Sequence, residues 1–412
     1  MGLSAHAAAF ARAHPGRAAS PKQGKELPMA QANPTAEVAS RELLDSLRAN
    51  HQVLAGGARD HDSLIDLVGT ARFALLGEAS HGTREFYRER IRITQRPIVE
   101  KGSNAVAVEA DWPDAWRVNR YVRHRSDDND AASALGGFER FPAWMWRNTE
   151  VRDFVEWLRE FNQGRPDARK VGFYGMDLYS LFGSIQFVLE YLDRTHPEEA
   201  RRARALYDCF EPAGGDSQAY GYGASTGLSP SCEDEAIQQL REMNRLVAAA
   251  PAGAGAEDRD ELFFAQQNAR LVRNAEEYYR TMFRGRVSSW NLRDSHMVET
   301  VQALDRHFQA MHTPARMAIW AHNSHLGDAS ATQMGDLGEW NVGQLMRDRF
   351  GTDAVLVGFS THRGSVTAAS DWDEPPQRKR VREGLAGSWE DVFHQLETER
   401  FRDDMISMIT HD

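Results

Sequence analysis

Five short apolar runs recur along the chain, and each one stops abruptly at polar residues. The runs cover residues 72–76, 105–108, 170–174, 316–320 and 354–357. Continuous apolar runs of this length are typical of strands that are buried on both faces, as in a parallel sheet covered by helices.

Helical patterns fill the gaps between these runs. Thr83 and Thr149 are predicted N-caps of two helices, and a third amphipathic pattern follows Asp177. Strand, polar turn and helix therefore repeat in the order expected for right-handed crossover units. The pattern predicts an α/β fold, with a mainly parallel sheet covered by helices.

The chain changes character between residues 233 and 311, where charged segments carry apolar residues at three-to-four spacing. We expect this segment to be a helical insertion or bundle. The glycine-rich stretch 208–231 before it is predicted to be a loop and a candidate lid. Residues 1–35 are predicted to be a disordered tail, and residues 36–412 one large domain, because no linker-like segment divides the middle.

Composition narrows the classes of partner. The formal net charge is −11, which argues against nucleic acid, because such binding needs a basic surface. A neutral or cationic small molecule fits better. No apolar run reaches the ~18 residues of a membrane span. The only cysteines are Cys209 and Cys232; a disulfide between them stays open, but the low count favours a cytoplasmic protein.

Acids and histidines follow the predicted strands. In open parallel sheets, ligands bind beyond the carboxyl ends of the strands, so side chains far apart in sequence would meet at one edge. Polar residues also end strands for structural reasons alone. That explanation suffices for one or two strands that end in acids or histidines, but it is less convincing for five. The candidates are Glu78, His81, Glu109, Asp111, Asp177, His322 and His325.

Common covalent and nucleotide chemistries find no support in the motifs. No G-x-S-x-G pentapeptide surrounds Ser80 or Ser324, and neither a P-loop nor a G-x-G-x-x-G follows a strand. Water activated by a general base remains, and an imidazole with a pKa near ~6.5 suits that role. Glu78 and His81 are three residues apart and can supply orienter and base. Arg90 would hold a carboxylate or an oxyanion, although a solvated helix face or a structural salt bridge is the simpler interpretation.

A metal-dependent hydrolase is the alternative. Glu78, His81, His322, His325 and Asp177 are residue types that bind divalent ions. The spacing of His322 and His325 is weak evidence, because an H-x-x-H outside a helix has no fixed geometry.

Seven segments, in order along the chain, resemble the erythromycin esterase family. They are GEASHGTREF at 77–86, EADW at 109–112, MWRNTEV at 145–151, FYGMDLYS at 173–180, NLRDSHM at 291–297, WAHNSH at 320–325 and NVGQL at 341–345. The resemblance extends over residues 36–395. The segment 397–412 departs from the family pattern, and we expect a truncated or atypical C-terminal end.

The resemblance implies an α/β core with a helical part that forms a deep cleft. It also implies hydrolysis of the macrolactone ester of erythromycin-like antibiotics, which confers resistance, without a cofactor or metal. In this family the residue at His81 activates water and the one at Glu78 supports it. The matches at Arg90, Glu109, His322 and His325 would complete the catalytic cleft.

We therefore expect a carboxylic ester hydrolase that acts on a small-molecule ester or macrolide. Asp111, Trp112, Trp146 and Asp177 are the predicted substrate-binding residues, although ordinary core packing is an alternative for each tryptophan. A non-catalytic small-molecule binding protein is the third hypothesis. The sequence carries no indication of an oligomeric state.

Overall fold

A computed structural model describes residues 41–49, 51–251, 253, 255–283, 285–311, 313–398 and 406–409. Its contacts divide the chain into two compact units. One comprises Asp62–Phe359, and the other combines the described residues up to His61 with those from Ser360 onward. The predicted tail, residues 1–35, lies outside the described residues, as do 399–405 and 410–412 of the segment expected to be atypical.

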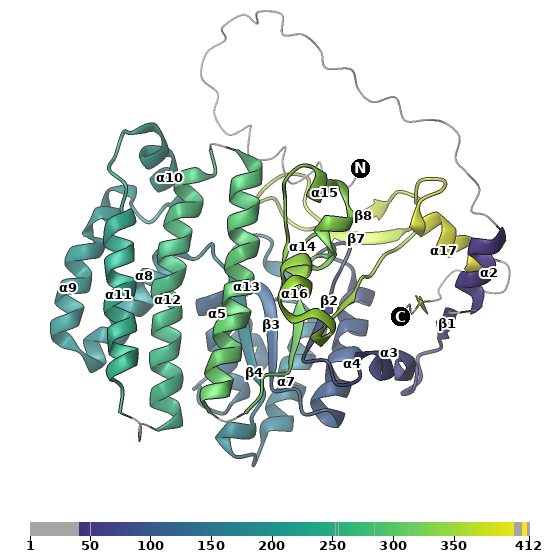
Figure 1. The fold of residues 1–412 in the computed structure, drawn as a ribbon, viewed down its shortest axis with the longest axis horizontal. Coiled ribbons are helices and arrows are strands. Elements are labelled where there is room, and N and C mark those ends of the chain that lie inside the picture. The colour runs from purple at the N-terminus through teal and green to yellow at the C-terminus, as the bar shows by residue number, and fades with distance from the viewer. Residues whose placement is uncertain are drawn as a thin grey trace, which may run out of the picture. The chain divides into compact units, whose positions relative to one another are not determined.

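A five-stranded parallel sheet forms the centre of the unit Asp62–Phe359 (Figure 1). Its strands are β2 (Phe73–Leu76), β3 (Ala105–Asp111), β4 (Gly172–Asp177), β5 (Met317–Trp320) and β6 (Ala354–Val357), in the order β4-β3-β5-β2-β6. Every residue of β2 to β5 is buried. The five apolar runs are thus the five strands, and the predicted α/β fold class is confirmed.

Helices connect and cover these strands, as parallel topology requires. They are α3 (Asp62–Val68), α4 (Arg84–Glu100), α5 (Trp112–Val122), α6 (Ala131–Ala134), α7 (Thr149–Asn162), α8 (Leu181–Thr195), α14 (Asn323–Leu326), α15 (Gln333–Asp336) and α16 (Val342–Phe350). Short 3₁₀ turns lie at Leu135–Gly137, Ala143–Met145, Asp167–Arg169, Ala329–Ala331 and Gly351–Asp353.

The predicted caps are only partly right. Thr83 precedes α4 in an extended conformation, but its side chain makes no capping hydrogen bond. The cap of α7 is Asn148, not Thr149, because the Asn148 side chain accepts a hydrogen bond from the backbone N–H of Val151. Asparagine and threonine are both good caps, so the pattern alone could not choose between adjacent residues.

A further group of helices packs beside the sheet. It contains α9 (Pro197–Tyr207), α10 (Ser217–Thr226), α11 (Glu233–Ala249), α12 (Ala256–Thr281) and α13 (Arg286–Ala310). Figure 1 shows α9, α11 and α12 side by side, and the last three helices fill the segment expected to be helical. Among the described residues, no helix is both long and apolar enough to cross a bilayer.

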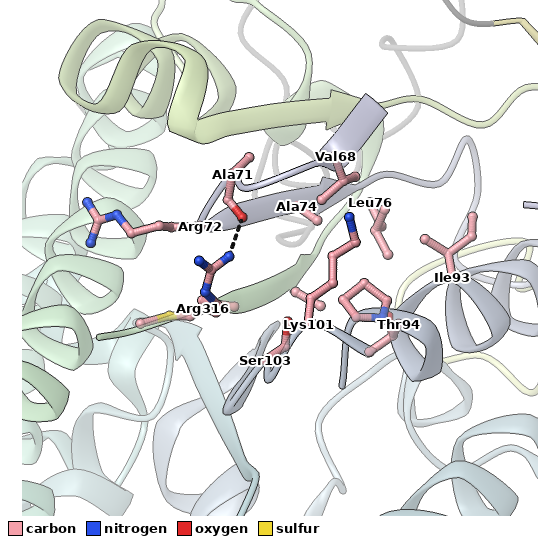
Figure 2. A pocket seen from close by; sticks show the side chains of 13 residues that line it. Val68, Ala71, Arg72, Ala74, Leu76, Ile93, Thr94, Lys101, Ser103 and Arg316 are labelled. Carbon is pink, nitrogen blue, oxygen red and sulfur yellow. Dashed lines mark hydrogen bonds between the residues drawn. The ribbon is translucent and has the colours of Figure 1, made fainter. Parts of the chain in front are cut away.

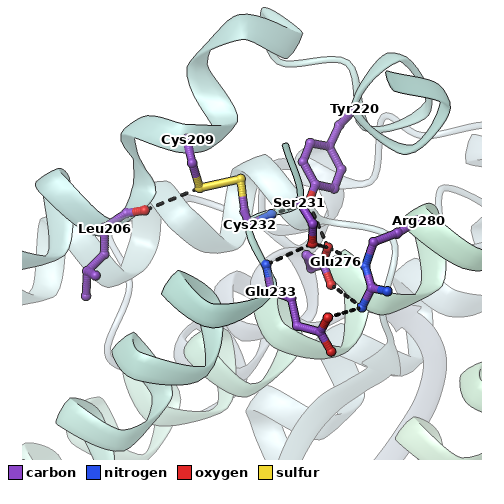
Figure 3. The surroundings of a disulfide bond; sticks show 8 residues. All are labelled: Leu206, Cys209, Tyr220, Ser231, Cys232, Glu233, Glu276 and Arg280. Carbon is purple, nitrogen blue, oxygen red and sulfur yellow. Dashed lines mark hydrogen bonds and ion pairs between the residues drawn. A yellow bond between two sulfur atoms is a disulfide. The ribbon is translucent and has the colours of Figure 1, made fainter. Parts of the chain in front are cut away.

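The stretch 208–231 is not the loop that its glycines predicted. It forms a 3₁₀ helix, η5 (Asp208–Ala213), and then α10. A disulfide joins Cys209 to Cys232, and the Tyr220 hydroxyl donates to the Glu276 carboxylate at 2.8 Å (Figure 3). Because Phe210 and Tyr220 are also buried, apolar packing and the cross-link hold this segment in place.

The second unit contains two antiparallel strand pairs. One pairs β1 (His51–Leu54) with β9 (Ile406–Ile409), and the other pairs β7 (Gly364–Ala368) with β8 (Gln377–Val381). The helices α2 (Arg41–Ala49) and α17 (Trp389–Thr398) also belong to this unit. The sequence pattern missed β7 and β8 because six of their ten residues are polar and none of the ten is buried.

Candidate active site

Polar side chains from four adjacent strands meet at the carboxyl edge of the sheet. Glu78 and His81 follow β2, Glu109 lies in β3, Asp177 ends β4, and His322 follows β5. The structure brings these residues, with Arg90 and His325, into one continuous set of contacts. Because β5 lies between β2 and β3, His322 contacts both His81, which follows β2, and Glu109, which lies in β3.

His81 is oriented by a buried carboxylate. Its Nδ1 lies 2.8 Å from Oε1 of Glu78, and the Glu78 side chain is 1% exposed. The His81 side chain itself is 18% exposed, so its ring is accessible at one side. The Tyr87 hydroxyl also donates to the His81 carbonyl oxygen at 3.0 Å. The spacing of Glu78 and His81 thus produces the contact expected of an orienter and a base.

The pKa of His81 is raised above its ordinary value. Burial alone lowers the pKa, but the hydrogen bond and charge of Glu78, helped by the charge of Glu109, outweigh that effect. The imidazole therefore holds a proton more readily than a free histidine. As a general base it would need a pH above this raised pKa.

Arg90 is a buried partner of Glu78. Its Nη2 donates to Oε2 of Glu78 at 2.8 Å, and its side chain is 0% exposed. The guanidinium also stacks over the rings of Tyr87 and Trp320, at 4.6 and 5.1 Å from their centroids. This placement corresponds to the salt-bridge interpretation of Arg90, which makes it a positioning residue for Glu78.

The turn after β2 is held by Asn323. The Asn323 backbone N–H donates to the Glu78 carbonyl at 2.8 Å, and its side-chain amide donates to the Phe359 carbonyl at 2.5 Å. A Cβ at Gly77 would lie only 2.0 Å from Oδ1 of Asn323. Glycine is therefore needed at position 77 because another chain segment approaches its backbone closely.

His322 is a neutral hydrogen-bond donor next to His81. The centroids of the two rings are 5.2 Å apart. Burial, together with the charge of His81, lowers the pKa of His322 to about 4. Its Nδ1 accepts a hydrogen bond from the Ser324 backbone N–H at 3.1 Å. The proton of the neutral ring must then reside on Nε2.

Glu109 fixes the backbone of His322. Its Oε2 accepts the His322 backbone N–H at 2.8 Å, and its Oε1 accepts from Arg293 at 2.7 Å. Burial raises the pKa of Glu109, but the charges of His325, Arg293 and His81 more than compensate and hold it well below the usual value. Glu109 is thus an anion that connects His322 to a buried network.

Arg293 is the centre of that network, and the sequence reasoning did not select it. It donates to both oxygens of Asp177 at 2.9 and 2.8 Å as well as to Glu109. Arg293 lies in α13, far from every predicted strand, so strand-end reasoning could not find it. The only available signal was its place in the NLRDSHM segment that resembles the family.

His325 is buried and held from both sides. Its Nδ1 lies 2.9 Å from Asp294, its Nε2 lies 3.3 Å from Glu109, and its ring stacks on Trp290. Burial opposes protonation, as does Arg293, but Asp294 and Glu109 raise the pKa of His325 to about 9. Nη1 of Arg293 lies 2.9 Å from the same Nε2, so both ring nitrogens of His325 already have protein partners. In the described part of the chain, no three His, Cys, Asp or Glu side chains are arranged to hold a metal ion, so this geometry does not favour the metal-dependent alternative.

The two acids predicted to bind substrate, Asp111 and Asp177, end the adjacent strands β3 and β4. Asp111 accepts a hydrogen bond from Arg140 at 2.9 Å, and Asp177 is neutralised by Arg293. The Arg140 guanidinium is partly exposed and stacks on the Tyr179 ring at 4.4 Å. Arg140 is therefore the part of this group that solvent reaches most readily.

The two tryptophans predicted to bind substrate lie in the core. Trp112 stacks against Tyr174 and Phe264, and Trp146 packs against Phe138. Both indole rings are buried. Their placement matches the alternative of ordinary core packing.

A cavity between α4 and the strands β2 and β5 is too small for a substrate. Its lining includes Arg72 and Arg316, which precede β2 and β5, together with Leu76 and Ile93 (Figure 2). Its volume is about 10 Å³, which is roughly the space for one water molecule. Lys101 points along it and donates to the carbonyls of Ile65 and Gly69. These contacts indicate a structural role.

Comparison of the sequence with known proteins finds similarity to erythromycin esterases over most of the chain. The family model described as erythromycin esterase matches residues 98–409, a range that begins after His81. An erythromycin esterase type II from Escherichia coli is 23% identical over 325 residues, covering 75% of this chain and 73% of that protein.

Three solved structures share the fold. A succinoglycan biosynthesis protein has a TM-score of 0.67 at 18% identity, covering 87% of this chain and 84% of its own. A Bacillus cereus protein has a TM-score of 0.66 at 21% identity, covering 86% and 83%. A mutant of the erythromycin esterase EreC in its open conformation has a TM-score of 0.58 at 17% identity, covering 79% of each chain.

Proposed function

Because this chain belongs to the erythromycin esterase family, we propose that it cleaves a small-molecule ester or lactone with His81 as general base. Family membership makes it a hydrolase of the esterase type. The observation that carries the proposed mechanism is the contact between the partly exposed His81 ring and the buried Glu78 carboxylate. This pair has the geometry of a base and its orienting acid.

The reaction follows from the tautomer of His81. When Nδ1–H donates to Glu78, the lone pair of the neutral ring lies on Nε2. Nε2 accepts a proton from water while the water oxygen forms a bond to the ester carbonyl carbon. The tetrahedral intermediate then expels the alkoxide, which takes the proton from the imidazolium. The products are a carboxylic acid and an alcohol, or one hydroxy acid from a lactone.

His322 is the proposed oxyanion donor. Its Nε2–H is a neutral donor beside His81, and a donor aimed at the developing negative charge lowers the barrier of acyl transfer. A neutral imidazole can serve in this way without competing for the proton that His81 removes.

Glu109, Arg293 and His325 are proposed as positioning residues. Glu109 holds the His322 backbone, Arg293 and His325 keep Glu109 anionic, and Asp177 fixes Arg293. We assign the contact with the substrate's polar groups to the region of Asp111 and Arg140, where a guanidinium reaches solvent.

The proposed substrates are macrolide lactones, which would make the protein an antibiotic-resistance enzyme. The support is the naming of the Escherichia coli relative and of EreC as erythromycin esterases. The cytoplasmic location remains a prediction.

Replacement of His81 tests the mechanism. We expect His81→Asn to lower kcat/KM for ester hydrolysis by about 10²–10⁴-fold, the usual contribution of a general base. Hydrolysis of a panel of macrolides and simple esters would be followed by mass spectrometry, and folding by circular dichroism. His124→Asn is the matched control, because His124 is exposed, its ring contacts a backbone carbonyl, and it has a positive φ that asparagine tolerates. Normal turnover by folded His81→Asn would refute the mechanism.

A further inference from the structure

A second cavity, of about 370 Å³, lies between α11, α12 and α13. Leu240, Val247 and Phe263 contribute apolar walls, and Arg270 and Arg306 contribute two positive charges. The volume falls in the range of small-molecule sites, which combine apolar walls with a few polar groups. Among its described lining residues there is no acidic side chain.

Arg270 is a mostly buried cation whose charge is only weakly compensated. Its side chain is 15% exposed, and the Glu299 carboxylate near its Nη1 is 3.9 Å away. Nη2 donates to the neutral Thr300 hydroxyl at 2.8 Å, and the buried Nε has no hydrogen-bond partner among the described residues. Burial lowers the pKa of Arg270 to about 10, a shift that Glu299 opposes and the charge of Arg306 increases.

Arg306 adds a second positive charge at the same cavity. It is exposed, and it makes no hydrogen bond or ion pair with any residue that the structure describes. His307, the next lining residue, contacts Asp260 at 2.9 Å and stacks on Phe263. Asp260 is also paired with Arg123 and Arg125, so this carboxylate is already shared and does not compensate Arg306.

We propose that this cavity is a binding site for an organic carboxylate. The carboxylate oxygens would accept hydrogen bonds from the guanidinium groups of Arg270 and Arg306, which are well suited to planar anions. The apolar body of the ligand would pack against Leu240, Val247 and Phe263. The two arginines favour an anionic ligand, because no acidic side chain among the described lining residues balances their charge. The apolar walls favour an anion that carries a hydrocarbon part.

The cavity is separate from the candidate active site. Arg293 of the site and Arg306 of the cavity are thirteen positions apart in α13, which corresponds to roughly 20 Å along a helix. Carboxylate binding here is therefore independent of the proposed ester hydrolysis, and one can fail while the other holds.

Titration calorimetry on the full chain tests the site. We expect octanoate to bind saturably with one-to-one stoichiometry, and 1-octanol and inorganic phosphate to bind at least tenfold more weakly. Arg306→Gln should weaken octanoate binding at least tenfold, whereas Arg306→Lys should retain most of it. Arg241→Gln removes an exposed charge from α11 outside the cavity, and it should leave the affinity unchanged.

Several results would overturn the proposal. They are an absence of saturable octanoate binding, equal binding of 1-octanol, or an unchanged affinity in folded Arg306→Gln. The same titration with His81→Asn should give the unaltered affinity, because His81 lies at the other site. Loss of octanoate binding in that variant would place the ligand in the candidate active site and contradict the inference.

Discussion

A single carboxylate controls both the orientation and the protonation of His81. Glu78 accepts from Nδ1 of His81 and is itself held by Arg90. The cost of burying this carboxylate is offset by two charge-assisted contacts, which is the usual requirement for a buried ion. The same carboxylate raises the pKa of the base that it orients.

Glu78→Gln should shift the pH dependence of hydrolysis. Glutamine removes the negative charge that raises the pKa of His81, so the neutral, basic ring persists to lower pH. We expect the acidic limb of kcat/KM to move to lower pH, while the maximal rate falls because the ring is less well oriented. The measurement is a pH–rate profile. Glu85→Gln changes an exposed acid in the first turn of α4 and should leave the profile in place; an acidic limb that stays or moves upward in Glu78→Gln would contradict the assignment.

At the scale of elements, the turn after β2 and the start of α14 form one interlocked unit. Asn323 precedes the rest of α14 and bonds both the Glu78 carbonyl and the Phe359 backbone. Its approach to Gly77 places β2, β5 and β6 in a fixed relation at their carboxyl ends. Glu78 and His81 follow directly from this junction.

Gly77→Ala should therefore damage the site as well as the fold. The added methyl group would lie 2.0 Å from Oδ1 of Asn323, so the turn or Asn323 must move. We expect a loss of about 1–3 kcal/mol in the free energy of unfolding, the usual range for overpacking, together with a marked loss of hydrolysis. Chemical denaturation and activity assays would measure both. Gly136→Ala is the control, because the atom nearest to its new Cβ would be 3.8 Å away; equal effects of the two substitutions would show that the close approach is unimportant.

At the scale of the whole molecule, the disulfide between Cys209 and Cys232 ties η5 to the start of α11. The sequence separation of the two cysteines is 23. The sequence left this bond open, because a low cysteine count argues against an oxidising environment but does not show which thiols are close. The bond bears on the cytoplasmic prediction, since cytosolic thiols are kept reduced.

Reduction of this disulfide should destabilise the protein without stopping catalysis. Opening a loop of this size costs about 3 kcal/mol through the entropy of the unfolded chain, and both cysteines lie outside the candidate active site. Denaturant unfolding with and without a reducing agent would show a lower midpoint after reduction. The double variant Cys209→Ser, Cys232→Ser should match the reduced protein and not respond to the reagent. A midpoint that is the same in all four samples would mean that the bond adds no stability.

The sequence by itself determined the elements and the residues that stand at their ends. Buried strands need continuous apolar runs, so the periodicity located all five strands and, with them, Glu78, His81, Glu109, Asp177 and His322. The three-residue spacing of Glu78 and His81 also predicted their contact, because both lie in one turn.

Tertiary structure decided which of these residues meet and in which state. The order β4-β3-β5-β2-β6 inserts β5 between β2 and β3, and no local periodicity specifies strand neighbours. Arg293 enters from α13, and the protonation of His322 and His325 depends on burial and on charges from distant segments. Local sequence patterns predict the backbone conformation of each segment. A functional site depends on contacts between distant segments, which exist only after the chain has folded.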